Sequence, residues 1–253
     1  MPAILTDIYR YPVKGLSGER LPHALLEAGA TILGDRMFAL GRPGLHFDVD
    51  NPVWMPKTNF LALVRDARLA ELSTLFDDAT SILSISENGT ILLSVDLSTT
   101  AGRAKVEGFF GKFLSDEFSN DPTLLKANDH TFSDLDDKVI SLINLGSVQA
   151  VAEETGAPVQ PLRFRANLYF EGIPAWSEHN WIDRQITVGQ TRLAVIKRTR
   201  RCAATNVNPE TAMRDMNIPA TLQKTWGHAD LGVYARVSDG GTLRPGDEIQ
   251  LQE

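Results

Sequence analysis

Short apolar segments separated by turn residues are the feature that most limits what this chain can fold into. Residues 4–10, 21–26 and 37–40 each carry apolar side chains over a length suited to a strand, and prolines and glycines stand between them. Strands that recur about every ten residues, with turn signals between them, are typical of all-β barrels and sandwiches. We therefore predict a mainly β structure for the first part of the chain.

Fewer segments favour helices. Apolar residues recur at helical intervals over 69–76 and 106–114, whereas Asn88-Gly89 between two apolar runs predicts a hairpin. Ser147 stands where an N-cap would begin a helix over 148–155. A short helix over 220–226 and a closing strand over 243–251 complete the prediction. Composition shifts between 97 and 108, so we divide the chain into two domains, 1–104 and 105–253.

Charge and cysteine content exclude several classes of protein. A formal net charge of −7 at pH 7 argues against general affinity for nucleic acid or anionic membranes. No apolar run approaches the roughly 20 residues that span a bilayer, and the first residues do not resemble a secretory signal. One cysteine in 253 residues excludes an internal disulfide framework and fits a reducing compartment. We expect a cytoplasmic protein.

That cysteine, Cys202, follows a segment that starts at Arg192 as an apolar strand pattern and becomes basic toward its end. The cations before it are Lys197, Arg198, Arg200 and Arg201. Positive charge favours the thiolate, which attacks electrophiles and binds metals, and arginine offers a fork of donors to phosphate. The segment predicts a reactive or metal-ligating sulfur beside an anion site. The alternative is a small buried apolar residue next to a solvated basic turn.

Other familiar sites have little support in the sequence. The five histidines stand at 23, 46, 130, 179 and 228, a spacing that does not suggest a zinc site. A Walker loop and a G-x-G-x-x-G motif are both absent from the sequence, as is the second cysteine that a disulfide oxidoreductase usually carries. A cysteine–histidine hydrolase stays open as a hypothesis, because its partners need only meet in space.

Basic residues outside the segment 192–202 also stand beside predicted turns. Each of them alone is typical of a solvated surface charge. Together they could form one anion-binding pocket, although the sequence does not bring them together. The residues of this candidate pocket are Lys14, Arg36, Ser147, Arg165, Asn167 and Arg201.

Short motifs in order along nearly the whole chain resemble those of one known family. Tyr11-Pro-Val-Lys14-Gly-Leu16 and Gly34-Asp35-Arg36 are similar to the opening of the N-terminal β-barrel domain that accompanies MOSC domains. The motifs that resemble the MOSC domain itself, named for the C-terminal part of molybdenum cofactor sulfurase, are Arg163-Phe-Arg165-Ala-Asn167, Trp181, Arg201-Cys202, Leu231-Gly232-Val233-Tyr234 and Arg244-Pro-Gly246-Asp247. The resemblance implies a mainly β, α+β fold, with an N-terminal β-barrel-like domain over 1–104 and a MOSC β-barrel with a few helices over 105–253.

The resemblance also implies roles for the candidate residues. In family members that bind the pterin molybdenum cofactor (molybdopterin), the cysteine that matches Cys202 is a direct ligand of molybdenum. The residues that match Lys14, Arg36, Arg165, Asn167 and Arg201 hold the phosphate and the pterin of that cofactor. Ser147 falls where relatives place a Ser/Thr turn against the cofactor. A soft thiolate suits molybdenum, and arginine suits a phosphate.

Three functions follow as hypotheses. The first is a molybdenum-dependent oxidoreductase that reduces N-hydroxylated compounds, similar to the amidoxime-reducing proteins. Its electrons would come from a separate protein, because this chain has no further cysteines for an iron–sulfur cluster. The second is a sulfur carrier or cofactor-delivery protein that uses a persulfide on Cys202, with a separate sulfur donor. The third is a non-enzymatic module that binds an anion or a pterin.

Overall fold

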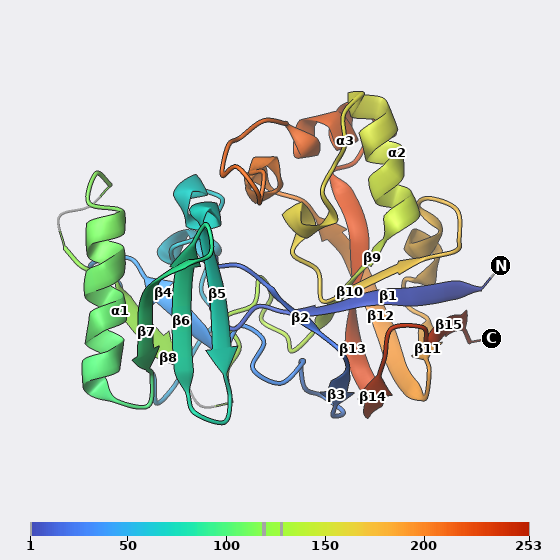
Figure 1. The fold of residues 1–253 in the computed structure, drawn as a ribbon. Helices are drawn as coiled ribbons and strands as arrows, with labels where there is room; N and C mark the ends of the chain where they lie inside the picture. The colour runs from blue at the N-terminus through green and yellow to red at the C-terminus, as the bar shows by residue number, and fades with distance from the viewer. Residues whose placement is uncertain (1, 118–119, 127–128, 253) are drawn as a thin grey trace.

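The computed structural model describes residues 2–117, 120–126 and 129–252, and its largest element is a closed barrel of seven strands (Figure 1). The strands around the ring are β10 (Leu168–Glu171), β9 (Ile140–Asn144), β13 (Asp230–Asp239), β12 (Thr191–Arg200), β11 (Gln185–Val188), β15 (Glu248–Leu251) and β1 (Ala3–Arg10), which returns to β10. The pair β9–β10 is parallel and the other pairs are antiparallel. A further strand, β2 (Glu19–Leu21), pairs with β1. The predicted fold class, mainly β with some helix, is confirmed.

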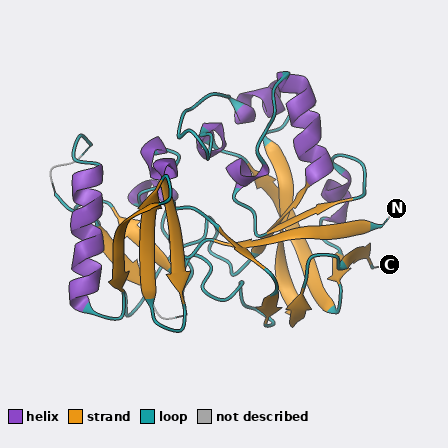
Figure 2. Cartoon of the chain, viewed as in Figure 1, coloured by secondary structure: helices purple, strands orange, loops and turns teal. Residues whose placement is uncertain are grey.

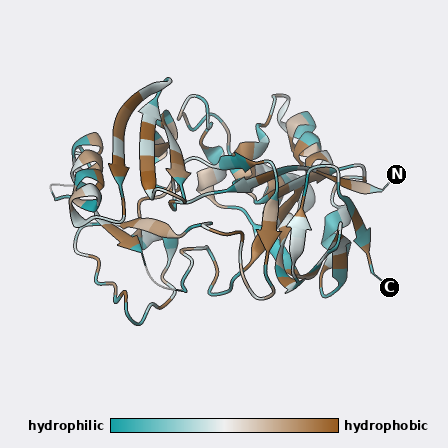
Figure 3. Cartoon of the chain, turned by 60° about the horizontal axis from the view of Figure 1, so that its bottom comes forward, coloured by the Kyte–Doolittle hydropathy of each residue, from teal (hydrophilic) through white to brown (hydrophobic). Residues whose placement is uncertain are grey.

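Alternating side chains fill the inside of the barrel. In β12, Leu193 and Val195 are fully buried, whereas Arg192 is exposed. Figure 3 shows hydrophobic and hydrophilic residues alternating along several strands. The pairing of β12 with β13 shifts register three times, and such bulges bend strands in the way a closed barrel requires. Period-two patterning and local bending together make the closed ring.

Strand β1 joins the barrel from the opposite end of the sequence. Ile4–Ile8 pairs with β10, and Ala3 and Ile4 also pair with β15. The side chains of Leu5 and Ile8 are fully buried in the barrel core. The first ten residues therefore complete a barrel whose other strands lie after residue 139. The division of the chain into domains at residue 104 stays a prediction.

Between β2 and β9 the chain forms smaller sheets and one long helix, on the left of Figure 1. The elements there are the pair β4 (Phe38–Gly41) and β8 (Thr123–Lys126), the sheet β5 (Leu72–Asp77), β6 (Ile82–Glu87) and β7 (Thr90–Asp96), helix α1 (Thr100–Phe113), and the 3-10 helices η1 (Lys57–Asn59) and η2 (Ala67–Glu71). Strand β3 (Ala24–Leu26) pairs instead with β14 (Gly241–Leu243). A second apolar core, which includes Phe38, Leu83 and Phe110, joins these sheets to α1.

The segment 69–76 is not the helix that its leucine spacing predicts. Its first residues end η2, and from Leu72 onward it is strand β5, in which Leu72, Thr74 and Phe76 point inward. Leucines three apart would share one face of a helix but point to opposite faces of a strand. Pairing with β6 selects the strand, in which Leu72 is buried and Leu75 is exposed. The hairpin at Asn88-Gly89 is confirmed, since it joins β6 to β7 with both turn residues at positive φ.

The remaining helices gather at one end of the barrel, as Figure 2 shows. They are α2 (Leu145–Thr155), α3 (Ile218–Trp226), η3 (Pro161–Phe164), η4 (Ser177–Trp181) and η5 (Ala203–Asn206). Helix α2 begins earlier than predicted, because the side chain of Asn144, not Ser147, is its N-cap and accepts a hydrogen bond from the Gly146 amide. Within the described part of the chain, no helix is long and apolar enough to cross a membrane.

An aromatic cluster connects η4 to the end of α3. The ring of Trp176 packs against Trp226, and the rings of His179 and His228 lie 5.4 Å apart. Only 7% of His179 is exposed, and its Nε2 has no hydrogen-bond partner among the described residues. Burial, with the nearby charges of Arg198 and His228, lowers the pKa of His179 to about 4. The folded protein therefore holds this imidazole neutral.

Closing the barrel should depend on the buried face of β1. We expect Leu5→Ala to lower the free energy of unfolding by about 2–5 kcal/mol, because it leaves a cavity in the barrel core. The same truncation at the exposed Leu25 of β3 should change it by less than about 0.5 kcal/mol. Urea unfolding followed by tryptophan fluorescence measures both. Equal effects of the two substitutions would contradict the role given to β1.

The buried imidazole predicts a loss of stability in acid. Below about pH 6.5 the unfolded chain takes up a proton at His179 that the folded chain refuses until about pH 4, so stability falls as the pH falls through this window. Across this window His179 lowers the free energy of unfolding by about 3 kcal/mol. We expect His179→Phe to flatten the unfolding free energy between pH 6.5 and 4, and the exposed His23→Phe to retain the decline. An unchanged slope in His179→Phe would show that other groups cause it.

Candidate functional site

A pocket lies where the loops of the first half of the chain meet one end of the barrel. Its empty space, counted to the open mouth, is about 880 Å³. Six of the predicted site residues line it: Lys14, Arg36, Arg165, Asn167, Arg201 and Cys202. Lining residues outside the candidate set include Lys57, Asp134, Thr199 and Tyr234, and Arg200 of the basic segment also lines the pocket. The structure thus brings together predicted site residues that are up to 188 positions apart in the sequence, from Lys14 to Cys202.

Turns and strand ends carry the cations of the pocket. Lys14 follows β1, where the neighbouring Val13 forms a single bridge to Phe38 of β4. Arg36, before β4, and Arg165, at the end of η3, both have the left-handed backbone that reverses a chain sharply. Arg201 comes directly after β12. Loops held by rigid strands are the usual position for binding residues.

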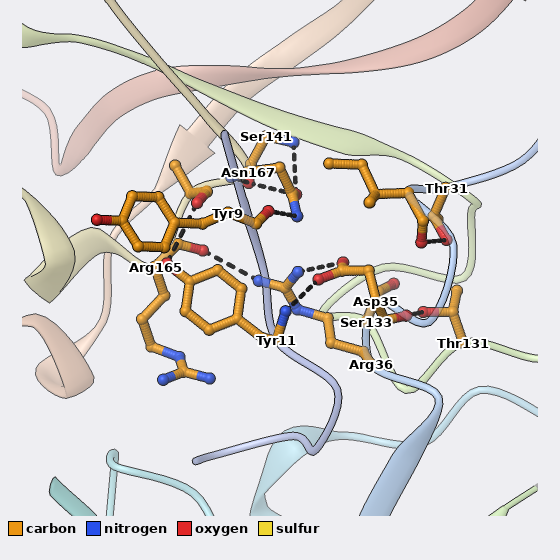
Figure 4. A network of polar contacts seen from close by, with 12 residues as sticks. Tyr9, Tyr11, Thr31, Asp35, Arg36, Thr131, Ser133, Ser141, Arg165 and Asn167 are labelled. Atoms are coloured by element: carbon orange, nitrogen blue, oxygen red, sulfur yellow. Dashed lines mark hydrogen bonds and ion pairs between the residues drawn. The ribbon is translucent and has the colours of Figure 1, made fainter. Parts of the chain in front are cut away.

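The ring of Tyr11 organises two of these cations (Figure 4). The guanidinium carbon of Arg36 lies 4.8 Å from the ring centroid, and that of Arg165 lies 4.4 Å from it. Arg36 Nη2 also donates to the Arg165 carbonyl at 3.0 Å, and Arg36 forms an ion pair with Asp35. Tyr11 is fully buried, and its hydroxyl donates to the Ala166 carbonyl. Cation–π contacts of this kind hold both arginines in place.

Arg201 is buried and bonded only to main-chain oxygens. Its Nε donates to the Leu231 carbonyl at 2.8 Å, and its Nη1 donates to the Phe164 carbonyl at 3.0 Å. Neither Arg201 nor Arg165 forms an ion pair with any residue that the structure describes. Burial lowers the pKa of both guanidinium groups, yet arginine stays protonated. Arg165 and Arg201 therefore bring to the pocket positive charge that forms no ion pair with a described carboxylate, which favours an anionic ligand.

Lys14 and Lys57 approach each other through Asp134. Lys14 Nζ donates to Asp134 Oδ1 at 2.9 Å, and Lys57 Nζ donates to Asp134 Oδ2 at 2.8 Å. Burial lowers the pKa of Lys14, although Asp134 opposes the shift. Burial also works against the charge of Lys57, but Asp134 and the Cys202 side chain outweigh it and raise the pKa of Lys57. Burial works against the charge of Asp134 too, but the two ammonium groups prevail and lower its pKa.

Cys202 lies at the N-terminus of η5 with an extended backbone. Its carbonyl accepts hydrogen bonds from the amide and the hydroxyl of Thr205, and its side chain is partly exposed in the pocket. This placement differs from the alternative of a small apolar residue in the core. The basic segment before it divides, since Lys197 and Arg198 are exposed away from the pocket, whereas Arg200 and Arg201 line it.

Asn167 lies under the pocket and joins three strands of the barrel. Its side-chain oxygen accepts from the amide and the hydroxyl of Ser141, at 3.1 and 3.0 Å, and its side-chain amide donates to the Tyr9 carbonyl (Figure 4). Thr199, on β12, differs from Asn167 because its side chain is not hydrogen-bonded to any described residue. It is only 2% exposed, and its hydroxyl has no hydrogen-bond partner among the described residues. A buried hydroxyl that lines a pocket without a partner is available to a ligand.

Ser147, the remaining residue of the predicted site, does not line the pocket among the described residues. It is fully buried in α2, where its hydroxyl donates to Glu178 Oε1 at 2.8 Å and accepts from the Trp176 amide at 2.9 Å. Burial raises the pKa of Glu178, and Asn144 also donates to its carboxyl group. These bonds join α2 to η4. Ser147 therefore supports the packing of α2 and does not contact the pocket that the described residues line.

A cluster of metal-binding side chains is not found either. Among the described residues, no three histidine, cysteine, aspartate or glutamate side chains gather as they would around a metal ion. The side chain in the pocket best suited to a soft metal is Cys202. Two further residues of the site stand within the motifs quoted above: Tyr11, which packs against Arg36 and Arg165, and Tyr234, which lines the pocket. Lys57 stands in no such motif.

Comparisons with known proteins agree with this geometry. Mitochondrial amidoxime-reducing component 1 from Xenopus laevis is 27% identical over 122 residues, which cover 44% of this chain and 35% of that protein. The protein of the same name from Mus musculus is 26% identical over 105 residues, which cover 37% of this chain and 30% of that protein. The match thus spans about a third of the length of these relatives.

One solved structure aligns with almost the whole chain. The YUAD protein from Bacillus subtilis aligns over 98% of this chain and 94% of its own, with a TM-score of 0.46 and 15% identity. A model of one family, the MOSC domain, matches residues 127–250. Those residues supply β9 to β13 and most of β15 of the barrel, together with Arg165, Arg201 and Cys202 of the pocket. The chain is therefore a MOSC-domain protein, with that domain over residues 127–250.

Proposed function

We propose that the pocket binds the pterin molybdenum cofactor and that the thiolate of Cys202 is the protein ligand of its molybdenum. One observation carries the proposal. The only cysteine of the chain opens into a pocket where the guanidinium groups of the half-buried Arg165 and the buried Arg201 have no carboxylate partner among the described residues. A soft sulfur beside uncompensated positive charge matches a ligand that combines a soft metal with a phosphate.

The residues present fit such a group. A thiolate is a preferred ligand type for soft metals, and arginine is the side chain best shaped for a phosphate. The unpartnered hydroxyl of Thr199 offers a hydrogen bond to a polar ligand at the edge of the pocket.

The cations would contribute in two ways. Arg165 is fixed by Tyr11 and by one bond to the Leu16 carbonyl, so its other N–H groups are available to a phosphate. Arg201 donates three of its five N–H groups to carbonyls and would act mainly through its charge. Asn167 would act indirectly, because its bonds hold β9, β10 and β1 together under the site. When bound, the cofactor supplies two-electron chemistry coupled to oxygen-atom transfer.

We further propose that the protein is an oxidoreductase that reduces N-hydroxylated compounds. The names of the two relatives, amidoxime-reducing components, support this substrate class, and the region that matches the MOSC family model contains Arg165, Arg201 and Cys202. The electrons would come from a separate protein, because Cys202 is the only cysteine in the chain and an iron–sulfur cluster needs several. Reduction of an amidoxime by the purified protein, with a chemically reduced dye as electron source, tests the activity.

Metal content tests the ligand assignment. After expression in a host that makes the cofactor, we expect about one molybdenum per chain in the wild type, and its loss in Cys202→Ser, because a hydroxyl is a poor ligand for a soft metal. Elemental analysis and pterin fluorescence measure the two parts of the cofactor. A wild type that purifies without metal, while Cys202 accepts sulfur from a desulfurase, would replace this proposal with the sulfur-carrier function. Metal and sulfur contents that are both unchanged by Cys202→Ser would leave an anion- or pterin-binding module.

The pocket cations should retain the cofactor. We expect Arg165→Ala to lower the bound pterin at least about tenfold, because it removes a charged donor to the phosphate. The matched control is Arg192→Ala, an exposed arginine of β12 whose ion pair with Asp239 lies on the surface. Pterin fluorescence of the purified variants measures the content. Equal pterin in both variants would remove Arg165 from the site.

A further inference from the structure

A carboxylate of the protein lies between two lysines of the pocket. Asp134 Oδ1 is 2.9 Å from Lys14 Nζ, and Asp134 Oδ2 is 2.8 Å from Lys57 Nζ. The carboxylate therefore uses one oxygen for each ammonium group, as a bridging oxyanion ligand would. The positive charges of Arg36, Arg165 and Arg201 line the same pocket. Asp134 thus lies where the field of the pocket attracts negative charge.

The donors of Lys14 show what would follow if the carboxylate left. Its ammonium group has three N–H bonds, and two are occupied by main-chain carbonyls, of Phe132 at 2.8 Å and of Ser133 at 3.3 Å. The third is directed at Asp134. Without that carboxylate, one N–H of Lys14 and one of Lys57 would point at the same place. Two converging charged donors form a site for an oxyanion with at least two oxygen atoms.

Asp134 can leave this position without disturbing the core. Its side chain is 41% exposed and that of Lys57 is 30% exposed, whereas Lys14 is 7% exposed. The backbone before Asp134 is anchored, because the Phe132 amide donates to the Arg36 carbonyl. Rotation of one partly exposed side chain therefore suffices to free both ammonium groups.

We propose that Asp134 is an internal competitor that determines which anions enter the pocket. It occupies Lys14 and Lys57 when no ligand is bound, and an oxyanion with more than one negative charge takes its place. A dianion outcompetes it because it interacts more strongly with the surrounding arginines, whereas a monoanion gains little over the carboxylate that it must displace. The inference rests on the proposed function only for the identity of the natural anion, the phosphate of the cofactor.

Phosphate binding by the metal-free full-length chain tests the competition. We expect Asp134→Asn to bind inorganic phosphate about tenfold more tightly than the wild type in calorimetric titration, because the amide removes the competing charge and keeps the shape. Asp136→Asn, an exposed acid two residues further along the same loop, should bind phosphate like the wild type. Equal or weaker binding by Asp134→Asn would overturn the proposal, since Asp134 would then only position the lysines.

A double variant assigns the gain to the lysines. Asp134→Asn combined with Lys57→Met should lose the tenfold gain, because only one of the two converging donors remains. A gain that persists in the double variant would place the phosphate elsewhere and overturn the proposal. Thermal unfolding without phosphate shows whether each variant is folded. The gain in phosphate affinity does not depend on molybdenum. A chain that shows this gain but never acquires the metal would support the competition by Asp134 and contradict the proposed cofactor.

Discussion

Buried guanidinium groups are the constraint on which this structure depends. Away from the pocket, carboxylates accompany the buried arginine of β1, since Arg10 forms ion pairs with Glu19 and Asp78. In the pocket the arrangement differs, since Arg201 has only main-chain carbonyls as partners. Carbonyl dipoles satisfy the N–H groups but do not cancel the charge. The fold thereby tolerates positive charge inside the protein and directs it toward one opening.

The two halves of the chain share the construction of that opening. Loops of the first half provide Lys14 and Lys57, while the ends of barrel elements provide Arg165, Arg201 and Cys202. Strands hold the positions, and loops carry the chemistry. Cys202 alone would be an ordinary thiol on a β-barrel. The lysines and arginines around it make the pocket selective for anions.

The parts of this arrangement that follow from local sequence could be predicted. The barrel class follows from the strand pattern, and the motifs around Lys14, Arg165 and Cys202 identify the residues that the structure brings together. Lys57 could not be found, because it begins the short 3-10 helix η1 in a segment without periodicity and reaches the pocket only through tertiary structure. Ser147 looked like a helix cap, but Asn144 takes that role and the serine hydroxyl turns inward to Glu178. Local patterns do not report which of two neighbouring polar residues a fold will use.

The position of β1 in the barrel also has a consequence for how the chain reaches its native state. Ala3 pairs with Ile249, and Leu5 pairs with Phe170, so apart from its short pairing with β2 the first strand has no partner until most of the chain has been synthesised. Contacts between such distant residues are slow to form, because closing a long loop reduces chain entropy before any contact offsets the loss. During synthesis the apolar side chains of β1 are exposed, and they are a natural target for a chaperone. The barrel that carries the pocket is therefore completed last.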